Sequence, residues 1–343
     1  MNVAVVRDDR FLAHKTGHAH PENPARLKAV YRMLDREFAN QLLYLTPRLA
    51  TLEQLELVHT PVYINKVLKT AEHDFTSLAT HTPASAQTYL SAWLAAGSCL
   101  AGIDALMSGC CRICLCLVRP PGHHALPDRA AGFCVFNNLA ISARYAIQQF
   151  KVERVLIIDW DVHHGNGIQD IFYKEKTVFY FSTHDMLLYP FTGDFSDTGS
   201  GDGSGYTLNI PLPRETGDDD LLCVYRSVLS PLMAAYRPQL ILVSAGFDAH
   251  QRDPIGRLGL SAAVFGRLTE LVISLANGEN KPPILFSLEG GYEPGALADC
   301  VREVLKPLTA ECLAADDAAK ATPLGEQLVA KARQMHAAFA IWT

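Results

Sequence analysis

The sequence predicts a single α/β domain spanning residues 1–343, with a mostly parallel central sheet and helices on both faces. Three observations predict this fold. Short strand-like runs recur along the 343 residues, helical patterns separate them, and the runs are almost continuously apolar. Strands that alternate with helices in this way form parallel sheets whose two faces are covered. No linker or internal repeat interrupts the alternation, which favours one domain.

The predicted elements follow one another along the chain. Runs rich in apolar and β-branched residues predict strands at 3–6, 113–118, 154–159, 177–181, 239–243 and 283–287, and an alternating run predicts one at 206–210. Apolar residues spaced by three and four predict helices at 24–38, 84–107, 138–150, 218–236, 261–276, 294–308 and 324–339. In a parallel sheet of this kind, chemistry is expected just beyond the carboxyl ends of the strands.

Composition excludes some classes of partner. The chain is 49% hydrophobic and 19% charged, which is typical of a compact fold, and its net charge of -6 provides no general attraction to nucleic acid. No run approaches the ~20 apolar residues of a membrane span, so we expect no membrane partner. The oligomeric state is not indicated by the sequence.

The nine cysteines, from Cys99 to Cys312, are an odd number, and no secretory signal opens the chain, so we expect a reducing, cytoplasmic location. Four of them cluster at 110–116. A closed zinc site needs a second Cys or His pair, and none follows, so core packing is the favoured interpretation for this cluster.

Polar side chains follow five of the predicted strands. The segments are RPPGHH at 119–124, DWDVHH at 159–164, STH at 182–184, SAGFD at 244–248 and LEGGY at 288–292. Because the carboxyl ends of parallel strands meet at one edge of the sheet, we expect these Asp, His and Tyr side chains to converge there.

Three of these residues are candidate metal ligands. Asp161 and His163 alternate and therefore point the same way, although alone they fit a capped turn equally well, and Asp248 adds a third donor. Three protein ligands with an open fourth position describe a catalytic zinc site, and two carboxylates with one imidazole also suit ferrous iron or cobalt. The rival is a two-metal ureohydrolase, which needs more carboxylates than follow His163 and Asp248.

Two further features suit hydrolysis. His123 and His124 follow a Pro-Pro-Gly turn and are candidates to move protons, with Asp159 and Asn166 as acceptors that orient them. Tyr292 follows two glycines and is a candidate hydrogen-bond donor to a developing oxyanion. Taken alone, each of these has a plain structural interpretation as a packed His pair or a glycine turn.

These motifs together resemble the zinc-dependent histone deacetylase family. The resemblance rests on RPPGHHA at 119–125, GFCVFNN at 132–138, DWDVHHGNG at 159–167, SAGFD and LEGGY, in that order, and on the opening GHAHPENPARL at 17–27. It covers about residues 14–310. The Asn at position 166 is similar to the class II and bacterial histone deacetylase-like amidohydrolase branch.

The resemblance implies a role for each residue. It implies zinc ligation by Asp161, His163 and Asp248, proton handling by His123 and His124, and a catalytic hydroxyl on Tyr292. Asp159 would orient His123 and Asn166 would orient His124. Gly132, Phe133, Tyr189 and Ile255 would line the substrate tunnel. Potassium would bind at Asp159, Asp161, His163, Ser182 and Thr183, and at an outer site formed by Phe172, Glu175, Val178 and Tyr206.

The resemblance leaves the substrate open between two classes. It implies hydrolysis of acyl-lysine in a protein or peptide, or of a small acylated amine. A polyamine-selective member would be expected to carry an acidic residue at the position of Ile255, so the apolar side chain favours acyl-lysine, with acetylpolyamine as the alternative. A catalytically silent acyl-binding module is a further alternative, but it would be expected to lack one of the site residues.

Overall fold

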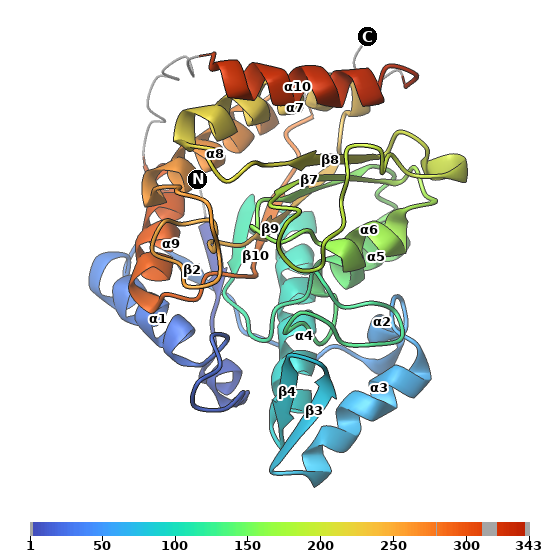
Figure 1. The fold of residues 1–343 in the computed structure, drawn as a ribbon. Coiled ribbons are helices and arrows are strands. Elements are labelled where there is room, and N and C mark those ends of the chain that lie inside the picture. Colours follow the sequence, from blue (N-terminus) through green and yellow to red (C-terminus); the bar gives the residue numbers. More distant parts are fainter. Residues whose placement is uncertain (1–2, 279, 311–320, 340–343) are drawn as a thin grey trace.

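In the computed structural model, residues 3–278, 280–310 and 321–339 are described. An eight-stranded sheet forms the centre of the molecule (Figure 1), in the order β2-β1-β5-β10-β9-β6-β7-β8, and every neighbouring pair is parallel. Its strands are β1 (Val3–Val6), β2 (Leu43–Tyr44), β5 (Ile113–Cys116), β6 (Val155–Asp159), β7 (Val178–His184), β8 (Thr207–Pro211), β9 (Leu240–Ala245) and β10 (Ile284–Leu288). The predicted fold class is confirmed.

Two layers of helices cover the sheet (Figure 1). On one side, α7 (Asp218–Tyr236), α8 (Ala262–Ala276), α9 (Pro294–Thr309) and α1 (Ala25–Glu37) pack in sequence against one another, and α10 (Pro323–Met335) lies on α7. The other side carries α4 (Thr88–Met107), α5 (Asn138–Phe150) and α6 (Asn166–Phe172). Apart from the exposed edge strand β2, the strands between these layers are almost wholly buried, which explains their continuous apolar runs.

Sequence patterns located the long elements to within a few residues. The bounds of α5 and α7 are those predicted, because clear local signals mark them. The Asn137 side chain caps the start of α5 by accepting from the Ala140 N–H, and both helices end at a residue in the left-handed conformation, Lys151 and Arg237.

The predicted helix at 84–107 begins too early. Ala84 and Ser85 belong instead to β4 (Thr82–Ser85), which pairs antiparallel with β3 (Phe75–Ala79) in a small hairpin. This hairpin was not predicted, because its two strands are short and β4 (TPAS) contains a proline, which argues against a strand. The sequence analysis also missed α2 (Leu52–Leu55), α3 (Pro61–Leu68) and α6, which are too short for a clear period.

The helix α4 corrects the expectation about membrane spans. By length and composition it is apolar enough to cross a membrane, although 67% of the relevant window is buried inside the protein. It packs against α5, β5, β10 and β1. A helix at the core of a folded domain passes the same test, so this is weak evidence for a span.

The cysteine cluster is divided by the fold. Cys114 and Cys116 are buried in β5 and Cys111 is also buried, as the core-packing interpretation predicts, whereas Cys110 is exposed. Cys312 lies outside the described residues. Within the described part of the chain, the groups of side chains suited to a metal ion do not include this cluster.

Candidate metal centre and active site

The predicted site residues meet at the carboxyl edge of the central strands. Asp159 ends β6 and pairs in register with Ser244 of β9 and Ser182 of β7. Strand β10, which precedes the LEGGY segment, pairs with β5 and β9, so its end lies beside both. The parallel register therefore gathers five loops that are far apart in the sequence.

The strongest cluster is formed by Asp161, His163 and Asp248. All three are buried, and one ligand atom of each lies within 4.8 Å of the others. His163 Nδ1 lies 3.0 Å from Asp161 Oδ1 and 3.0 Å from Asp248 Oδ2. Two carboxylates and an imidazole thus converge on one point, and this is a suitable donor set for a divalent cation.

Two glycines pack directly against these carboxylates and leave no space for a side chain of their own. A Cβ on Gly290 would lie 2.0 Å from Asp248 Oδ2, and a Cβ on Gly246 would lie 2.0 Å from Asp161 Oδ2. The N–H of Gly290 donates to Asp161 Oδ2 at 2.8 Å, and the N–H of Val162 donates to Asp248 Oδ1 at 2.8 Å. The main chain thus holds one oxygen of Asp248 and both oxygens of Asp161, since the N–H of His163 donates to Asp161 Oδ1, and such contacts orient ligands in advance.

The electrostatics of the cluster also favour a cation. Burial opposes a charged imidazole, yet the carboxylates of Asp248 and Asp161 raise the pKa of His163 to about 10. Burial, and then the nearby Asp161 carboxylate, raise the pKa of Asp248 to about 7. Two buried carboxylates this close repel each other, and a bound cation would compensate their charge. The residues present fit a metal ion.

The two histidine rings lie side by side, tilted by 46°, and have different partners. Their ring centroids are 4.0 Å apart. His123 Nδ1 lies 3.1 Å from Asp159 Oδ2, and His124 Nδ1 lies 2.8 Å from Asn166 Oδ1. The predicted orienting contacts of Asp159 and Asn166 are therefore present, and they leave the Nε2 atoms of both rings for other partners.

The surroundings of the two rings shift their pKa values in opposite directions. Burial opposes protonation of His123, but the carboxylates of Asp161 and Asp159 raise its pKa to about 10. Burial lowers the pKa of His124 well below its usual value, and the neighbouring His123 and His163 lower it further. The surroundings therefore raise the pKa of one imidazole of the pair and lower that of the other.

Tyr292 is positioned by its main chain and its ring. Its N–H donates to Asp253 Oδ2 at 2.6 Å, and the guanidinium of Arg26 lies 4.8 Å from its ring centroid. Arg26 also donates to the carbonyl oxygens of Glu289 and Gly291, on either side of Gly290. Burial, followed by the charge of Asp248, raises the pKa of the phenol well above its usual value, so it remains a donor.

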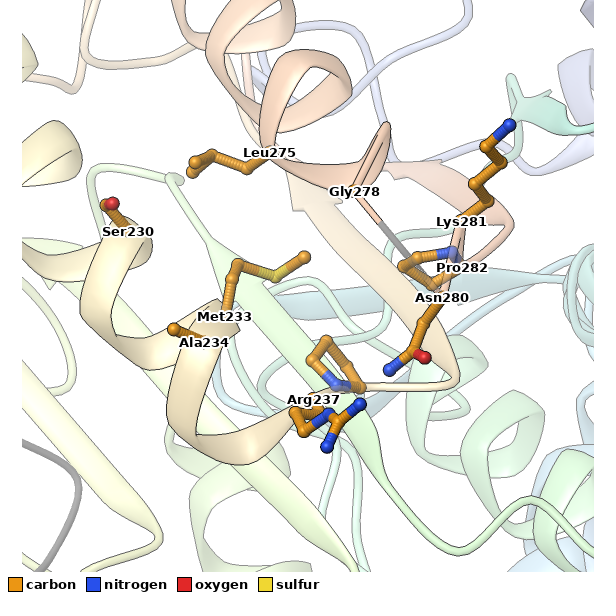
Figure 2. A pocket seen from close by; sticks show the side chains of 10 residues that line it. Ser230, Met233, Ala234, Arg237, Leu275, Gly278, Asn280, Lys281 and Pro282 are labelled. Atoms are coloured by element: carbon orange, nitrogen blue, oxygen red, sulfur yellow. The ribbon is translucent and has the colours of Figure 1, made fainter.

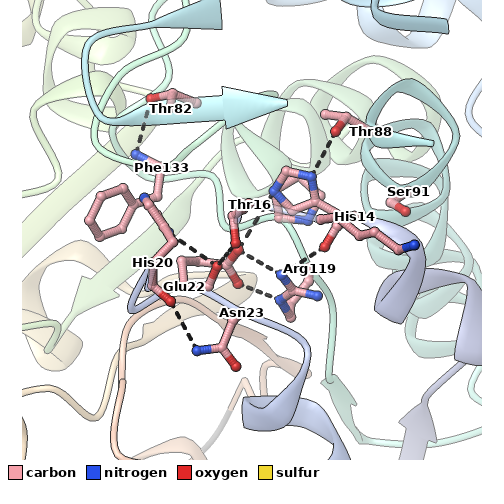
Figure 3. A network of polar contacts seen from close by, with 12 residues as sticks. His14, Thr16, His20, Glu22, Asn23, Thr82, Thr88, Ser91, Arg119 and Phe133 are labelled. Carbon is pink, nitrogen blue, oxygen red and sulfur yellow. Dashed lines mark hydrogen bonds and ion pairs between the residues drawn. The ribbon is translucent and has the colours of Figure 1, made fainter. Parts of the chain in front are cut away.

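Behind this segment lies a buried network of charges (Figure 3). The carboxylate of Glu22 accepts from Arg119 and from Arg26, and His14 Nε2 lies 3.6 Å from it. All four of these side chains are essentially inaccessible to solvent. The network fixes the amino-terminal segment against the loops that carry the His pair and Tyr292.

A cavity of about 300 Å³ leads to the metal cluster. His124, His163 and Tyr292 lie among its lining residues, as do all four predicted tunnel residues, Gly132, Phe133, Tyr189 and Ile255. A Cβ on Gly132 would lie 2.3 Å from the His124 ring, so only glycine fits there. The other lining residues, His81 and Phe191, were not predicted from the sequence.

Two acidic residues with clear structural roles were also missed. Glu289 accepts from the N–H groups of Gly122 and His123 and so holds the turn before the His pair. Asp253 accepts from the N–H groups of Tyr292, Ile255 and Gly256 and so connects the tyrosine with the tunnel wall. Glu289 directly follows the end of β10, which was its only signal in the sequence, whereas Asp253 lies in the loop after β9 and had none.

The residues implied for potassium lie at two places near β7. Ser182 and Thr183 are in β7 beside Asp159, and Ser182 Oγ lies 2.8 Å from His184 Nδ1. The outer set lies around the other end of this strand: Phe172, Glu175, Val178 and Tyr206. Both sets remain predictions.

A second cavity, of about 410 Å³, lies away from these groups (Figure 2). It is lined by the carboxyl-terminal parts of α7 and α8 and by the segment before β10, including Met233, Arg237 and Lys281. None of the predicted site residues lines it, so the chemistry belongs to the smaller cavity.

Comparisons with known proteins agree with this geometry. Residues 20–308 match the histone deacetylase domain. A "Probable deacetylase" of Archaeoglobus fulgidus is 36% identical over 302 residues, covering 87% of this chain and 83% of that protein. The human "Polyamine deacetylase HDAC10" is 39% identical over 293 residues, which are 82% of this chain and 43% of that protein. The crystal structure of an HDA15 HD domain superposes with a TM-score of 0.91 at 34% identity, covering 98% of this chain and 95% of that one.

The family resemblance predicted from the motifs is thereby confirmed. The match extends over most of the chain, and the relatives are similar to it at well above 30% identity. The chain belongs to the histone deacetylase family and is a hydrolase that acts on acetylated amines.

Proposed function

We propose that residues 1–343 form one catalytic domain that removes acyl groups from acyl-lysine in proteins or peptides. The observation that carries this proposal is the convergence of Asp161, His163 and Asp248 at the inner end of a narrow cavity, beside a histidine pair and Tyr292. A zinc ion held by these three residues would supply a Lewis acid for the acyl carbonyl and a water of lowered pKa.

The histidine pair handles the protons. The Nδ1 atoms are engaged by Asp159 and Asn166, so the Nε2 atoms are the ones that remain for proton transfer. In this mechanism the pair accepts a proton from the attacking water and delivers one to the departing amine. The products are a carboxylate and a free amine.

Tyr292 supplies the hydrogen bond to the developing oxyanion. Its raised pKa keeps the phenol protonated, and the contacts of its main chain and ring hold it in the cavity. A preorganised donor of this kind acts mainly on the transition state. Burial of the side chain, which is only 8% exposed, removes competing water.

The tunnel favours a neutral substrate stem. The residues that line it include aromatic rings and Ile255, but neither Asp nor Glu within the described chain. An acetylpolyamine carries further ammonium groups, which would lose hydration there without gaining a carboxylate partner. Acyl-lysine has an uncharged stem once acylated, so it fits this lining better, and acetylpolyamine is the second candidate.

One experiment tests the activity and the substrate together. Acetate release from an acetyl-lysine peptide and from N8-acetylspermidine is measured after metal removal by a chelator and after zinc, ferrous iron or cobalt is restored. The proposal expects activity that needs a metal and a higher kcat/KM for the peptide. A higher kcat/KM for acetylspermidine would favour the polyamine alternative, and binding without acetate release would favour a silent acyl-binding module.

Two further assignments accompany this proposal. We expect potassium to bind at the two sites near β7, which a potassium titration of activity and thermal stability would detect. We also expect the protein to work in the reducing cytoplasm, since the described cysteines are free thiols, including Cys114 and Cys116, whose sulfur atoms are 4.0 Å apart.

A further inference from the structure

Three residues around the tunnel share an unusual backbone conformation. His81, Phe133 and Phe191 have φ angles of +61°, +68° and +63°. Residues other than glycine rarely adopt this left-handed region. For the bulky rings of Phe133 and Phe191 it is an outlier, whereas histidine, as in the turn at His81, adopts it more readily. Elsewhere, Lys151 and Arg237 adopt it as the residues that end α5 and α7, where it is ordinary.

Two of the three rings lie outside the predicted tunnel wall. Phe133 and Tyr189 form that wall, and His81 and Phe191 line the same cavity. The Phe191 side chain is 70% exposed, and His81 is also exposed. A strained backbone that holds an aromatic ring in water, at the entrance of a substrate cavity, is retained when that ring has a function.

His81 is fixed relative to the tunnel wall. It lies in the turn between β3 and β4, and the next residue, Thr82, accepts the N–H of Phe133 at 3.2 Å through its Oγ1 (Figure 3). The hairpin that the sequence analysis missed therefore connects the entrance with the wall. A shift of this turn would move Phe133 as well.

Phe191 is held by hydrogen bonds within its own loop. Its N–H donates to the carbonyl of Leu188 at 2.8 Å, and the N–H of Leu188 donates to the carbonyl of Asp185 at 3.0 Å. The Asp185 carboxylate lies 3.2 Å from Arg257, which is on the same loop as Ile255. The ring of Phe191 is therefore presented by a structured turn.

We propose that His81 and Phe191 form an outer lip that contacts the peptide segment next to the acyl-lysine and selects an apolar residue there. The proposal rests on the proposed deacetylase function. Aromatic rings contribute by covering apolar surface, and Leu187, 69% exposed on the Phe191 loop, extends the same surface. Within the described residues the tunnel lining offers no carboxylate for a flanking cation, so apolar neighbours fit best.

The test replaces each ring by glycine, which accepts the left-handed backbone without strain. The variants are His81→Gly and Phe191→Gly. Each is measured on an acetyl-lysine peptide with leucine on both sides of the lysine, and on N-pentylacetamide, a small uncharged acylated amine that reproduces only the acetylated lysine side chain. We expect each variant to lower kcat/KM for the peptide about threefold to tenfold, mainly through KM, and to leave the small amine unchanged.

Thermal stability separates this role from a structural one. Since glycine relieves the left-handed strain, we expect the Tm of both variants to equal or exceed that of the unaltered protein. Lys151→Gly is the matched control for the backbone, because Lys151 has a φ of +58° far from the tunnel. Phe75→Ala is the matched control for an exposed ring, because Phe75 is 61% exposed on β3 and does not line the cavity.

Three outcomes would overturn the inference. The first is an equal loss of kcat/KM for both substrates in the lip variants. The second is an equal kcat/KM of the unaltered protein for peptides flanked by glutamate or lysine and for the leucine-flanked peptide. The third is that the lip variants behave like the two controls. If the unaltered protein released acetate from neither substrate, the proposed function would fail first, and the lip inference with it. Activity on the small amine without activity on the peptide would reject the peptide substrate and the lip together, and would leave the amidohydrolase activity standing.

Discussion

The inner end of the cavity and its entrance are built in different ways. At the inner end, Asp161, His163 and Asp248 follow buried parallel strands, and main-chain N–H groups hold the carboxylates. At the entrance, His81 and Phe191 sit on loops with left-handed backbones and exposed rings. The sheet thus positions the candidate metal ligands, whereas loops form the entrance, which we propose selects the substrate.

Asp253 connects these two regions. One carboxylate oxygen accepts the N–H of Tyr292 at the inner end, and the other accepts those of Ile255 and Gly256 at the tunnel wall. Tyr292 and the tunnel wall are therefore connected through one carboxylate. The comparison predicts that inner substitutions change kcat or metal content, and that outer ones change the choice of substrate.

The largest effect is expected at the metal cluster. In Asp248→Ala one of three donors is lost, so bound zinc, measured by elemental analysis, should fall from one per chain towards zero. Deacetylation should fall by more than about 1,000-fold, because the Lewis acid is lost with it. Asp128→Asn is a matched control, since Asp128 is exposed and pairs only with Arg129. Retention of a full equivalent of zinc in Asp248→Ala would exclude this ligand set.

The next effect is expected at Tyr292. Removing the hydroxyl in Tyr292→Phe should lower kcat about 100- to 1,000-fold with little change in KM, because the hydrogen bond forms mainly in the transition state. Steady-state kinetics on the acetyl-lysine peptide measure both constants. Tyr145→Phe serves as the control, since its hydroxyl donates to Asp104 far from the cavity. Near-normal kcat in Tyr292→Phe would contradict the assigned role.

A third effect concerns the support behind the His pair. His59 donates from Nδ1 to the carbonyl of Leu126 and accepts at Nε2 from the N–H of Asn137. Burial lowers the pKa of His59 to about 4, so its contribution to stability is present above pH ~6.5 and is lost as pH falls towards 4.

The size of the contribution of His59 to the free energy of unfolding follows from the shift of its pKa. About 2.5 pKa units correspond to roughly 3 kcal/mol at neutral pH. In His59→Gln, which keeps a donor and an acceptor, the free energy of unfolding from urea titrations should depend less on pH between 4 and 6.5. Equal pH slopes for the two proteins would show that His59 is not buried in its neutral form.

The smallest effect is expected at the tunnel wall. Ile255→Glu places a carboxylate where the unaltered lining has none, and should raise kcat/KM for N8-acetylspermidine relative to the peptide about tenfold. Ile255→Gln is the neutral control of the same length. If the glutamate and glutamine variants show the same substrate ratio, charge at this position does not determine the choice.

The sequence identified more residues at the inner end of the cavity than at its entrance. Asp161, His163, His123 and Tyr292 carry chemistry in motifs that end apolar strands, and these strands have a strong pattern. His81 lies in a hairpin turn and Phe191 in a loop, and no local pattern marks either as part of the tunnel. Glu289 was visible in its motif, but its contact with the N–H groups of Gly122 and His123 joins segments 166 residues apart.

The sequence by itself determined the alternation of strands and helices, the family and the candidate residues for the chemistry. These follow from the period of apolar residues and from short motifs, which are local properties of the chain. Only the tertiary structure decided that β10 lies between β5 and β9, that Arg26 reaches the Tyr292 segment, and that His81 lies at the same cavity as Phe191. The physical reason is that such contacts depend on strand order and loop packing, which involve residues far apart in the chain.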